Sequence, residues 1–286
     1  MLCPGCSKAW DSRRDGSAGG IVLFNDAAVG IAATTEKLSE YAAKLGIRTD
    51  SSPALPLLHF VETGYIRVER GPFTAFLDVA PVGPDYLPGH AHADTLTFEL
   101  SVRGQRVIVD SGTSCYGTGT ERQRQRSTAA HNTVEIDGES SSEVWSGFRV
   151  ARRAYPRELE MREEDGEIVV ACSHDAYRRL PGKPMHRREW RFQGEEIVIT
   201  DCVQGRFSEA VSRFHFHPEV RVEFTDSAEG RLWLTEAEAL RWRVQGGAAA
   251  VVPSSYHPHF GVSVPCQCLE IRFQNNHPQI THISAD

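Results

Sequence analysis

From Pro56 onward, many short runs of the sequence alternate apolar and polar residues with a period of two. Successive side chains of an extended strand point to opposite faces, so this period predicts half-buried β-strands. Turn signals such as Arg103-Gly104, Asp137-Gly138 and Gln204-Gly205 separate the runs and are typical of hairpins. The twelve candidate strands are 64–70, 73–79, 96–102, 106–110, 133–136, 168–171, 189–192, 197–201, 220–224, 231–234, 241–244 and 269–273. No helical pattern alternates with them, which argues against a parallel sheet. We expect a mainly β chain that forms a large antiparallel β-sandwich.

One helix is predicted, near the N-terminus. Thr34 and Thr35 are suitable N-cap residues, Gly46 is a suitable stop, and apolar residues recur between them at helical spacing. Residues 1–20 are polar and glycine-rich and are expected to form a loose leader. We therefore divide the chain into residues 1–55, a leader with a short helical segment, and residues 56–286, the sandwich.

The charge and the apolar content exclude two classes of partner. The chain has 38 acidic and 31 basic residues and a net charge of −7, so it lacks the surplus of cations that nonspecific nucleic-acid binding requires. No run approaches the roughly 20 apolar residues of a membrane span. The seven scattered cysteines do not resemble a disulfide framework, and no secretory signal begins the sequence. The compartment, bacterial periplasm or cytoplasm, stays open.

The segment with the most chemical information is Pro88-Gly89-His90-Ala91-His92-Ala93-Asp94. His90, His92 and Asp94 are two residues apart, so an extended backbone would place them on one face, in line with the core residues of the strand that follows. Asp110 ends a later apolar run, and His131 directly precedes another expected strand. Two histidines and one aspartate from three segments can form a three-ligand zinc site. The alternative is that these histidines have structural hydrogen-bond partners.

These residues resemble the signature of the heparinase II/III-like polysaccharide lyases. The match is nearly continuous over residues 86–150, and beyond Gly205 only a general β pattern remains. It rests on Pro88–Phe98, Gly104, Val109–Thr113, Tyr116, Arg122, Arg126–Val134, Asp137–Gly138, Trp145–Phe148, Tyr177 and His186–Arg188. Upstream, Leu23–Ala27 and the helix after it resemble the end of that family's helical domain.

The resemblance implies a function and a site. Members of the family pair an N-terminal (α/α) toroid with a β-sandwich and cleave uronic-acid polysaccharides by β-elimination. The resemblance also implies that His90 is catalytic and that His92, Asp110 and His131 bind a structural zinc. The family's catalytic tyrosine lies far upstream, in the toroid, but fewer than 90 residues precede His90. We therefore expect this chain to supply half of an active site for an acidic polysaccharide, with a toroid in a longer or separate chain. Whether the chain alone is an enzyme stays open.

Four further residues are candidates for substrate binding. Arg122 and Arg126 are expected in a loop, where guanidinium groups can bind substrate carboxylates, although a solvated loop with one structurally paired arginine is the alternative. Tyr116 flanks the histidine cluster, with a buried, backbone-bonded phenol as the alternative, and Trp145 is our choice for stacking on a sugar.

Two other functions stay open beside the lyase. A non-catalytic carbohydrate-binding or assembly module fits the sandwich and the missing toroid. A cupin-like metal enzyme fits the His-x-His motif on a β scaffold.

Overall fold

The computed structural model describes residues 21–47, 55–274 and 277–285. Their regular structure consists mostly of antiparallel strands, which confirms the predicted fold class of a mainly β sandwich with a short N-terminal helical segment. The expected leader, residues 1–20, lies outside the described residues. Within the described ranges, no helix is long and apolar enough to cross a membrane.

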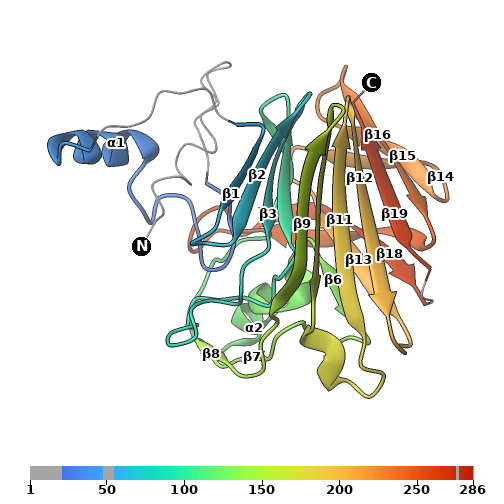
Figure 1. Ribbon diagram of the computed structural model, residues 1–286, viewed down its shortest axis with the longest axis horizontal. Helices are drawn as coiled ribbons and strands as arrows, with labels where there is room; N and C mark the ends of the chain where they lie inside the picture. Colours follow the sequence, from blue (N-terminus) through green and yellow to red (C-terminus); the bar gives the residue numbers. More distant parts are fainter. Residues whose placement is uncertain (1–20, 48–54, 275–276, 286) are drawn as a thin grey trace.

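The strands of the described residues form three larger sheets and one two-stranded ribbon (Figure 1). The five-stranded sheet has the order β1 (Leu57–Phe60), β2 (Tyr65–Arg70), β3 (Phe73–Asp78), β4 (Phe98–Val102) and β5 (Gln105–Ile108). The eight-stranded sheet has the order β14 (Arg221–Asp226), β15 (Glu229–Trp233), β16 (Ala239–Gln245), β19 (Gln279–Ser284), β12 (Glu196–Gln204), β11 (Met185–Gln193), β10 (Glu167–His174) and β9 (Pro156–Glu164). The four-stranded sheet has the order β17 (Ala248–Tyr256), β18 (Val264–Phe273), β13 (Ala210–His215) and β6 (Val134–Ile136), and the ribbon pairs β7 (Val144–Trp145) with β8 (Arg149–Val150).

Each of the twelve expected strands overlaps an observed one, so the positions that the period of two predicted are confirmed. The expected strands do not include seven strands of the described residues, which are β1, β7, β8, β9, β13, β17 and β19. The sequence of β17 begins with three alanines and contains Pro253, which cannot donate a ladder hydrogen bond. This proline is tolerated because β17 is the edge strand of its sheet.

The predicted helix is confirmed as α1 (Thr35–Lys44). It begins after Thr34, whose side-chain oxygen accepts a hydrogen bond from the backbone nitrogen of Lys37 at 3.4 Å. Figure 1 shows α1 to one side of the sheets. Tyr41 of this helix and Leu45, its C-cap residue, are exposed.

Residues 21–30 pack against the sandwich although they precede it in the sequence. Leu23 is buried with Val109 and Tyr256, and its backbone nitrogen donates to Oε1 of Glu99 at 2.8 Å. Phe24 is also buried. This packing brings the polar residues that follow Phe24 to the site described below. The division of the chain at residues 55 and 56 stays a prediction.

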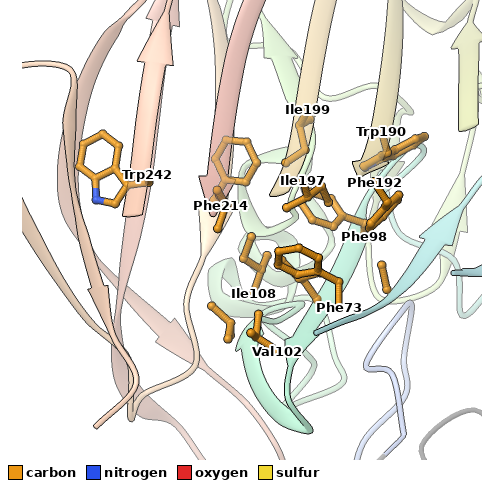
Figure 2. Packing of buried hydrophobic residues seen from close by; sticks show 14 of the residues in the cluster. Phe73, Phe98, Val102, Ile108, Trp190, Phe192, Ile197, Ile199, Phe214 and Trp242 are labelled. Atoms are coloured by element: carbon orange, nitrogen blue, oxygen red, sulfur yellow. The ribbon is translucent and has the colours of Figure 1, made fainter. Parts of the chain in front are cut away.

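The main core lies where the inner faces of the three sheets meet. Figure 2 shows Phe98 of β4 close to Trp190 of β11, and Phe214 of β13 on the other side. The ring centroid of Phe98 lies 6.3 Å from that of Trp190 and 6.0 Å from that of Phe214. Every second residue of β11 and β12 is buried, because one face of this sheet covers the core. The core therefore joins strands that are far apart in the sequence.

A buried ion pair lies among these aromatic rings. The Arg188 guanidinium donates through Nε to Oδ1 of Asp201 at 2.7 Å and through Nη2 to Oδ2 at 2.8 Å. Asp201 also accepts hydrogen bonds from His186 Nε2 at 2.7 Å and Ser212 Oγ at 2.8 Å. Burial alone would raise the pKa of the Asp201 carboxyl, but Arg188 and His186 hold it well below its usual range.

The remaining donor of Arg188 connects this ion pair to the loops of the site. Its Nη1 donates to the backbone carbonyls of Leu96, at 3.0 Å, and of Asn132. Leu96 lies two residues after Asp94, and Asn132 directly follows His131. Arg188 therefore holds two segments that carry candidate functional residues.

Candidate functional site

The segment from His90 to Thr97, between β3 and β4, is irregular. Leu96 has a φ of 64°, and the backbone nitrogen of Thr97 donates to the carbonyl of Asp94 at 2.8 Å, which closes a turn. The expectation that His90, His92 and Asp94 share one face of a continuous strand is therefore wrong. Because the backbone is not extended, residues two apart need not point to the same face. The side chain of His90 is 67% exposed, whereas that of His92 is fully buried.

A buried group of three side chains lies at this segment: His92, Asp94 and His131. One potential ligand atom of each lies within 4.8 Å of the others. In the described part of the chain, His92 Nδ1, Asp94 Oδ2 and His131 Nε2 are buried without a hydrogen-bond partner. Buried polar atoms without partners are costly. Three of them at one point fit a metal ion, because imidazole and carboxylate are common metal ligands.

Asp110, which follows β5, contacts the same group. Its Oδ2 lies 2.8 Å from Nδ1 of His131, and its Oδ1 accepts a hydrogen bond from the backbone nitrogen of Gly112 at 3.0 Å. Gly112 has a φ of 71°, and a Cβ there would lie 2.4 Å from a backbone oxygen, so this turn requires glycine. The structure thus places the predicted ligands His92 and His131 in one group with Asp94, and it places the predicted ligand Asp110 in contact with Nδ1 of His131.

Burial governs the protonation of this group. It raises the pKa of Asp94, and it raises that of the neighbouring Asp78 well above the usual value, with the charge of Asp94 adding to the effect. Burial also lowers the pKa of His92, which favours the neutral imidazole that binds metals. At His131, burial is outweighed by the carboxylate of Asp110, so the pKa is raised. The crowded carboxylates would be stabilised by a cation.

Asp26, which the sequence reasoning missed as a site residue, links this group to His90. Its buried carboxylate lies 2.9 Å from Nδ1 of His90 and 2.9 Å from Nε2 of His92, and it binds both terminal nitrogens of Arg122. Burial alone would raise the pKa of Asp26, but His92 and Arg122 hold it well below its usual range. The available signal was an aspartate in a short apolar run, which is too common to be specific.

Residues 120–126 form a helix, α2 (Thr120–Arg126), and the expectation of a loop here is wrong. Its buried side consists of three long polar side chains, Arg122, Gln125 and Arg126, in place of apolar residues. A search for apolar residues at helical spacing cannot detect such a helix. The helix positions the Arg122 guanidinium so that it binds Asp26, whose carboxylate in turn contacts His90.

The two predicted substrate-binding arginines are fully buried. The guanidinium of Arg126 donates to the backbone carbonyls of Ala91, Ser146 and Arg149 at 2.9, 3.3 and 3.2 Å. Burial and the charge of Arg122 lower the pKa of Arg126 to about 10. Both arginines thus make hydrogen bonds inside the protein, and their contact with a substrate stays a prediction.

Aromatic side chains surround His90 at the surface. Tyr116 is 42% exposed, and its ring centroid lies 6.1 Å from that of His90, 5.0 Å from Phe148 and 4.9 Å from Phe260. Phe148 and Phe260 are exposed as well. The predicted stacking residue Trp145 is also exposed, and its ring centroid lies 6.0 Å from the guanidinium of Arg149. We call Tyr116, Phe148 and Phe260 the aromatic surface.

His215 of β13 supports the segment that carries His131. In its buried ring, Nδ1 lies 2.9 Å from Oγ of Ser254, and Nε2 lies 3.1 Å from the carbonyl oxygen of Ala129. Its backbone nitrogen donates to Oδ1 of Asn132 at 2.6 Å. Burial lowers the pKa of His215 to about 4.

We expect the protein to lose stability as the pH falls from about 6.5 to about 4. In this window the unfolded chain binds a proton at His215 that the folded chain does not, so stability rises with pH. The contribution is on the order of 3 kcal/mol, because one pKa unit corresponds to about 1.4 kcal/mol. Urea unfolding at both ends of this window measures it.

The variant His215→Gln should lose less stability between the two pH values than the wild type. His282→Gln is the matched control, since His282 of β19 is partly exposed and pairs with Glu196 at the surface. An unchanged pH dependence in His215→Gln would contradict the prediction.

Three solved structures resemble the fold over most of the chain. Heparan sulfate lyase HepC from Pedobacter heparinus, in a mutant form, has a TM-score of 0.75 at 13% identity, covering 93% of this chain and 44% of its own. Heparinase III has a TM-score of 0.74 at 18% identity, covering 94% and 45%. The heparinase III product of the BT4657 gene has a TM-score of 0.73 at 17% identity, covering 93% and 44%. The chain thus spans less than half the length of these proteins.

The family comparison covers nearly the same region. The profile of the family described as "Heparinase II/III-like, C-terminal" matches residues 52–283. No curated protein matches the sequence significantly. The profile match extends over most of the chain, and the chain therefore belongs to the heparinase II/III-like family through its C-terminal domain.

Proposed function

We propose that this chain forms the β-sandwich part of a polysaccharide lyase, which cleaves a uronic-acid-containing polysaccharide by β-elimination, and that His90 is catalytic. The family match and the name of HepC, a heparan sulfate lyase, support this reaction class. One observation carries the assignment of His90: its side chain is 67% exposed while its Nδ1 is bound by the buried carboxylate of Asp26. A reactive imidazole needs this combination of access and fixed orientation.

In β-elimination, a base removes the proton α to the uronate carboxyl. The bond to the leaving glycosidic oxygen breaks, a double bond forms in the sugar ring, and the leaving oxygen takes a proton. We assign His90 a proton transfer in this sequence, through the nitrogen that does not face Asp26. Tyr116 beside it offers an aromatic face and a phenol to the sugar. Acidic polysaccharide is accordingly the proposed substrate class.

We further propose that the buried group binds a structural zinc ion. The proposed ligands are His92, Asp110 and His131, with the Asp94 carboxylate as the fourth donor. Four protein ligands make a closed site, which is typical of structural rather than catalytic zinc. The bound ion would neutralise the buried carboxylates and connect the segment after β3, the end of β5 and the segment before β6. The cupin-like alternative requires a redox-active iron in place of zinc, and metal analysis distinguishes the two.

We propose that the helical toroid of the family completes the active site, in a longer or a separate chain. The relatives are more than twice as long as the segment matched here, which is consistent with an additional domain. The aromatic surface and the exposed Tyr86, Leu87 and Trp145 offer apolar area for contact with such a domain.

The test follows the ultraviolet absorbance of the unsaturated uronate product from a panel of uronic-acid polysaccharides. The 286-residue chain is assayed alone and with an added family toroid domain. Where product forms, His90→Ala should reduce the rate by about 100-fold or more, because a general acid or base contributes roughly that factor. His282→Ala on β19 is the matched control and should retain the rate. Full activity of His90→Ala would exclude His90 as the catalytic residue.

A carbohydrate-binding module without catalysis is the second candidate, and the aromatic surface favours it, since exposed aromatic rings stack on sugars. This candidate predicts saturable binding of the polysaccharide by the chain without any double-bond product, with or without the toroid. That outcome would overturn the lyase proposal. Loss of binding in Tyr116→Ala and Phe260→Ala would then locate the binding surface.

A further inference from the structure

The carboxylate of Asp26 is the shared partner of two imidazoles and one guanidinium. Oδ2 lies 2.9 Å from Nδ1 of His90 and 2.8 Å from Nη2 of Arg122, while Oδ1 lies 2.9 Å from Nε2 of His92 and 3.4 Å from Oγ1 of Thr113. Arg122 is fully buried and binds both oxygens. A bidentate arginine of this kind holds the carboxylate ionised and fixes its plane.

An ionised carboxylate accepts hydrogen bonds and donates none. Each imidazole must therefore present an N–H to Asp26. His90 presents Nδ1 and His92 presents Nε2, so the two neutral rings are opposite tautomers. The lone pair of His90 is then on Nε2, and the lone pair of His92 is on Nδ1.

Each remaining nitrogen lies where the proposed chemistry needs a lone pair. Nδ1 of His92 is buried without a hydrogen-bond partner among the described residues, in the group formed with Asp94 and His131. Nε2 of His90 belongs to a largely exposed side chain beside the ring of Tyr116. With the tautomers reversed, His92 would direct an N–H toward the metal ligands, and His90 would have no lone pair for a proton.

We propose that Asp26 is a positioning residue that fixes His90 as the Nδ1–H tautomer and His92 as the Nε2–H tautomer. One carboxylate thereby couples the proton-transfer residue to the metal-binding group. Asp26 lies in residues 21–30, a segment that packs on the sandwich but is outside the region matched by the family profile. The role of the His90 lone pair rests on the proposed function, whereas the tautomer assignment does not.

The experiment is long-range proton–nitrogen NMR of the full chain labelled with ¹⁵N-histidine, at pH about 8, above the ordinary histidine pKa of about 6.5. His90→Gln and His92→Gln spectra assign the two rings. We expect Nδ1–H for His90 and Nε2–H for His92 in the wild type. If either ring carries its proton on the other nitrogen, the proposal is wrong, whatever the variants show.

The variant Asp26→Asn tests whether the carboxylate of Asp26 fixes the tautomers of His90 and His92. Its amide offers one acceptor oxygen and an NH₂ donor group, so at least one ring must accept a hydrogen bond and change its tautomer. Zinc affinity, measured by competition with a chelating dye, should fall about 10- to 100-fold where His92 is the ring affected. Asp26→Glu keeps a carboxylate and should retain both tautomers, and it covers the case in which Asp26→Asn does not fold.

Asp165→Asn is the matched control, since it makes the same change in the exposed turn between β9 and β10. Unchanged tautomers of both rings in a folded Asp26→Asn would overturn the proposal. The result is independent of lyase activity. The expected tautomers without any product would refute the proposed function alone, and product with other tautomers would refute the role of Asp26 alone.

Discussion

Replacing Arg188 by methionine is expected to lower the free energy of unfolding by about 3–5 kcal/mol, the cost of breaking a buried ion pair on one side. Asp201 would stay buried without its bidentate partner, and the carbonyls of Leu96 and Asn132 would lose their donor. Urea unfolding at neutral pH measures the loss. Because Leu96 and Asn132 flank Asp94 and His131, the variant should also bind zinc more weakly.

Arg191→Met on the same strand is the matched control. Arg191 is partly exposed and pairs with Glu167 and Glu189 at the surface, so its removal should cost less than about 1 kcal/mol. The double variant Arg188→Met/Asp201→Leu removes both charges and should recover part of the loss. Equal stabilities of Arg188→Met and Arg191→Met would show that the buried pair does not hold the core together.

Removing the proposed zinc ion is expected to destabilise the sandwich strongly. At a free zinc concentration of 1,000 times Kd, the bound ion contributes about 4 kcal/mol. Without it, the buried polar atoms of His92, Asp94 and His131 lack partners, and the carboxylates lack a counter-charge. Thermal unfolding with and without a chelator measures the change in Tm, and elemental analysis of the purified chain measures the zinc content.

His131→Ala should lower the zinc content from about one ion per chain to near zero and make Tm insensitive to the chelator. His282→Ala, at a partly exposed position on β19, should behave as the wild type. A wild-type chain that contains no zinc and whose Tm does not respond to added zinc would contradict the zinc proposal. Iron in place of zinc would instead support the cupin-like alternative.

Most of the strands were predictable because their signal is local. Burial on one face imposes a period of two on each strand, and this pattern can be read from a few neighbouring residues, as in β11 and β12. Helix α1 has a local N-cap at Thr34 and was predicted for the same reason. Helix α2 was missed because its buried residues are polar, so the usual apolar pattern is absent.

For most of the candidate site, the sequence indicated which residues take part but not how they are arranged. The resemblance pointed to His90, His92, Asp110 and His131, and the structure places them in one region. It could not indicate that the irregular backbone of residues 90–97 leaves His90 exposed and His92 buried. Two turns, closed by the hydrogen bonds from Ala91 to Pro88 and from Thr97 to Asp94, replace the continuous strand on which the expectation of a shared face depended.

Local sequence was thus sufficient for the class of fold, and the family resemblance was sufficient for most of the residues at the site. The contacts between distant segments were decided by tertiary structure alone. Asp26 lies 64 positions from His90 and 96 from Arg122, and Arg188 lies 92 from Leu96, yet each pair is hydrogen bonded. The physical reason is that such a pair is stable only where burial removes water and other segments fix both partners, and no local pattern records that arrangement.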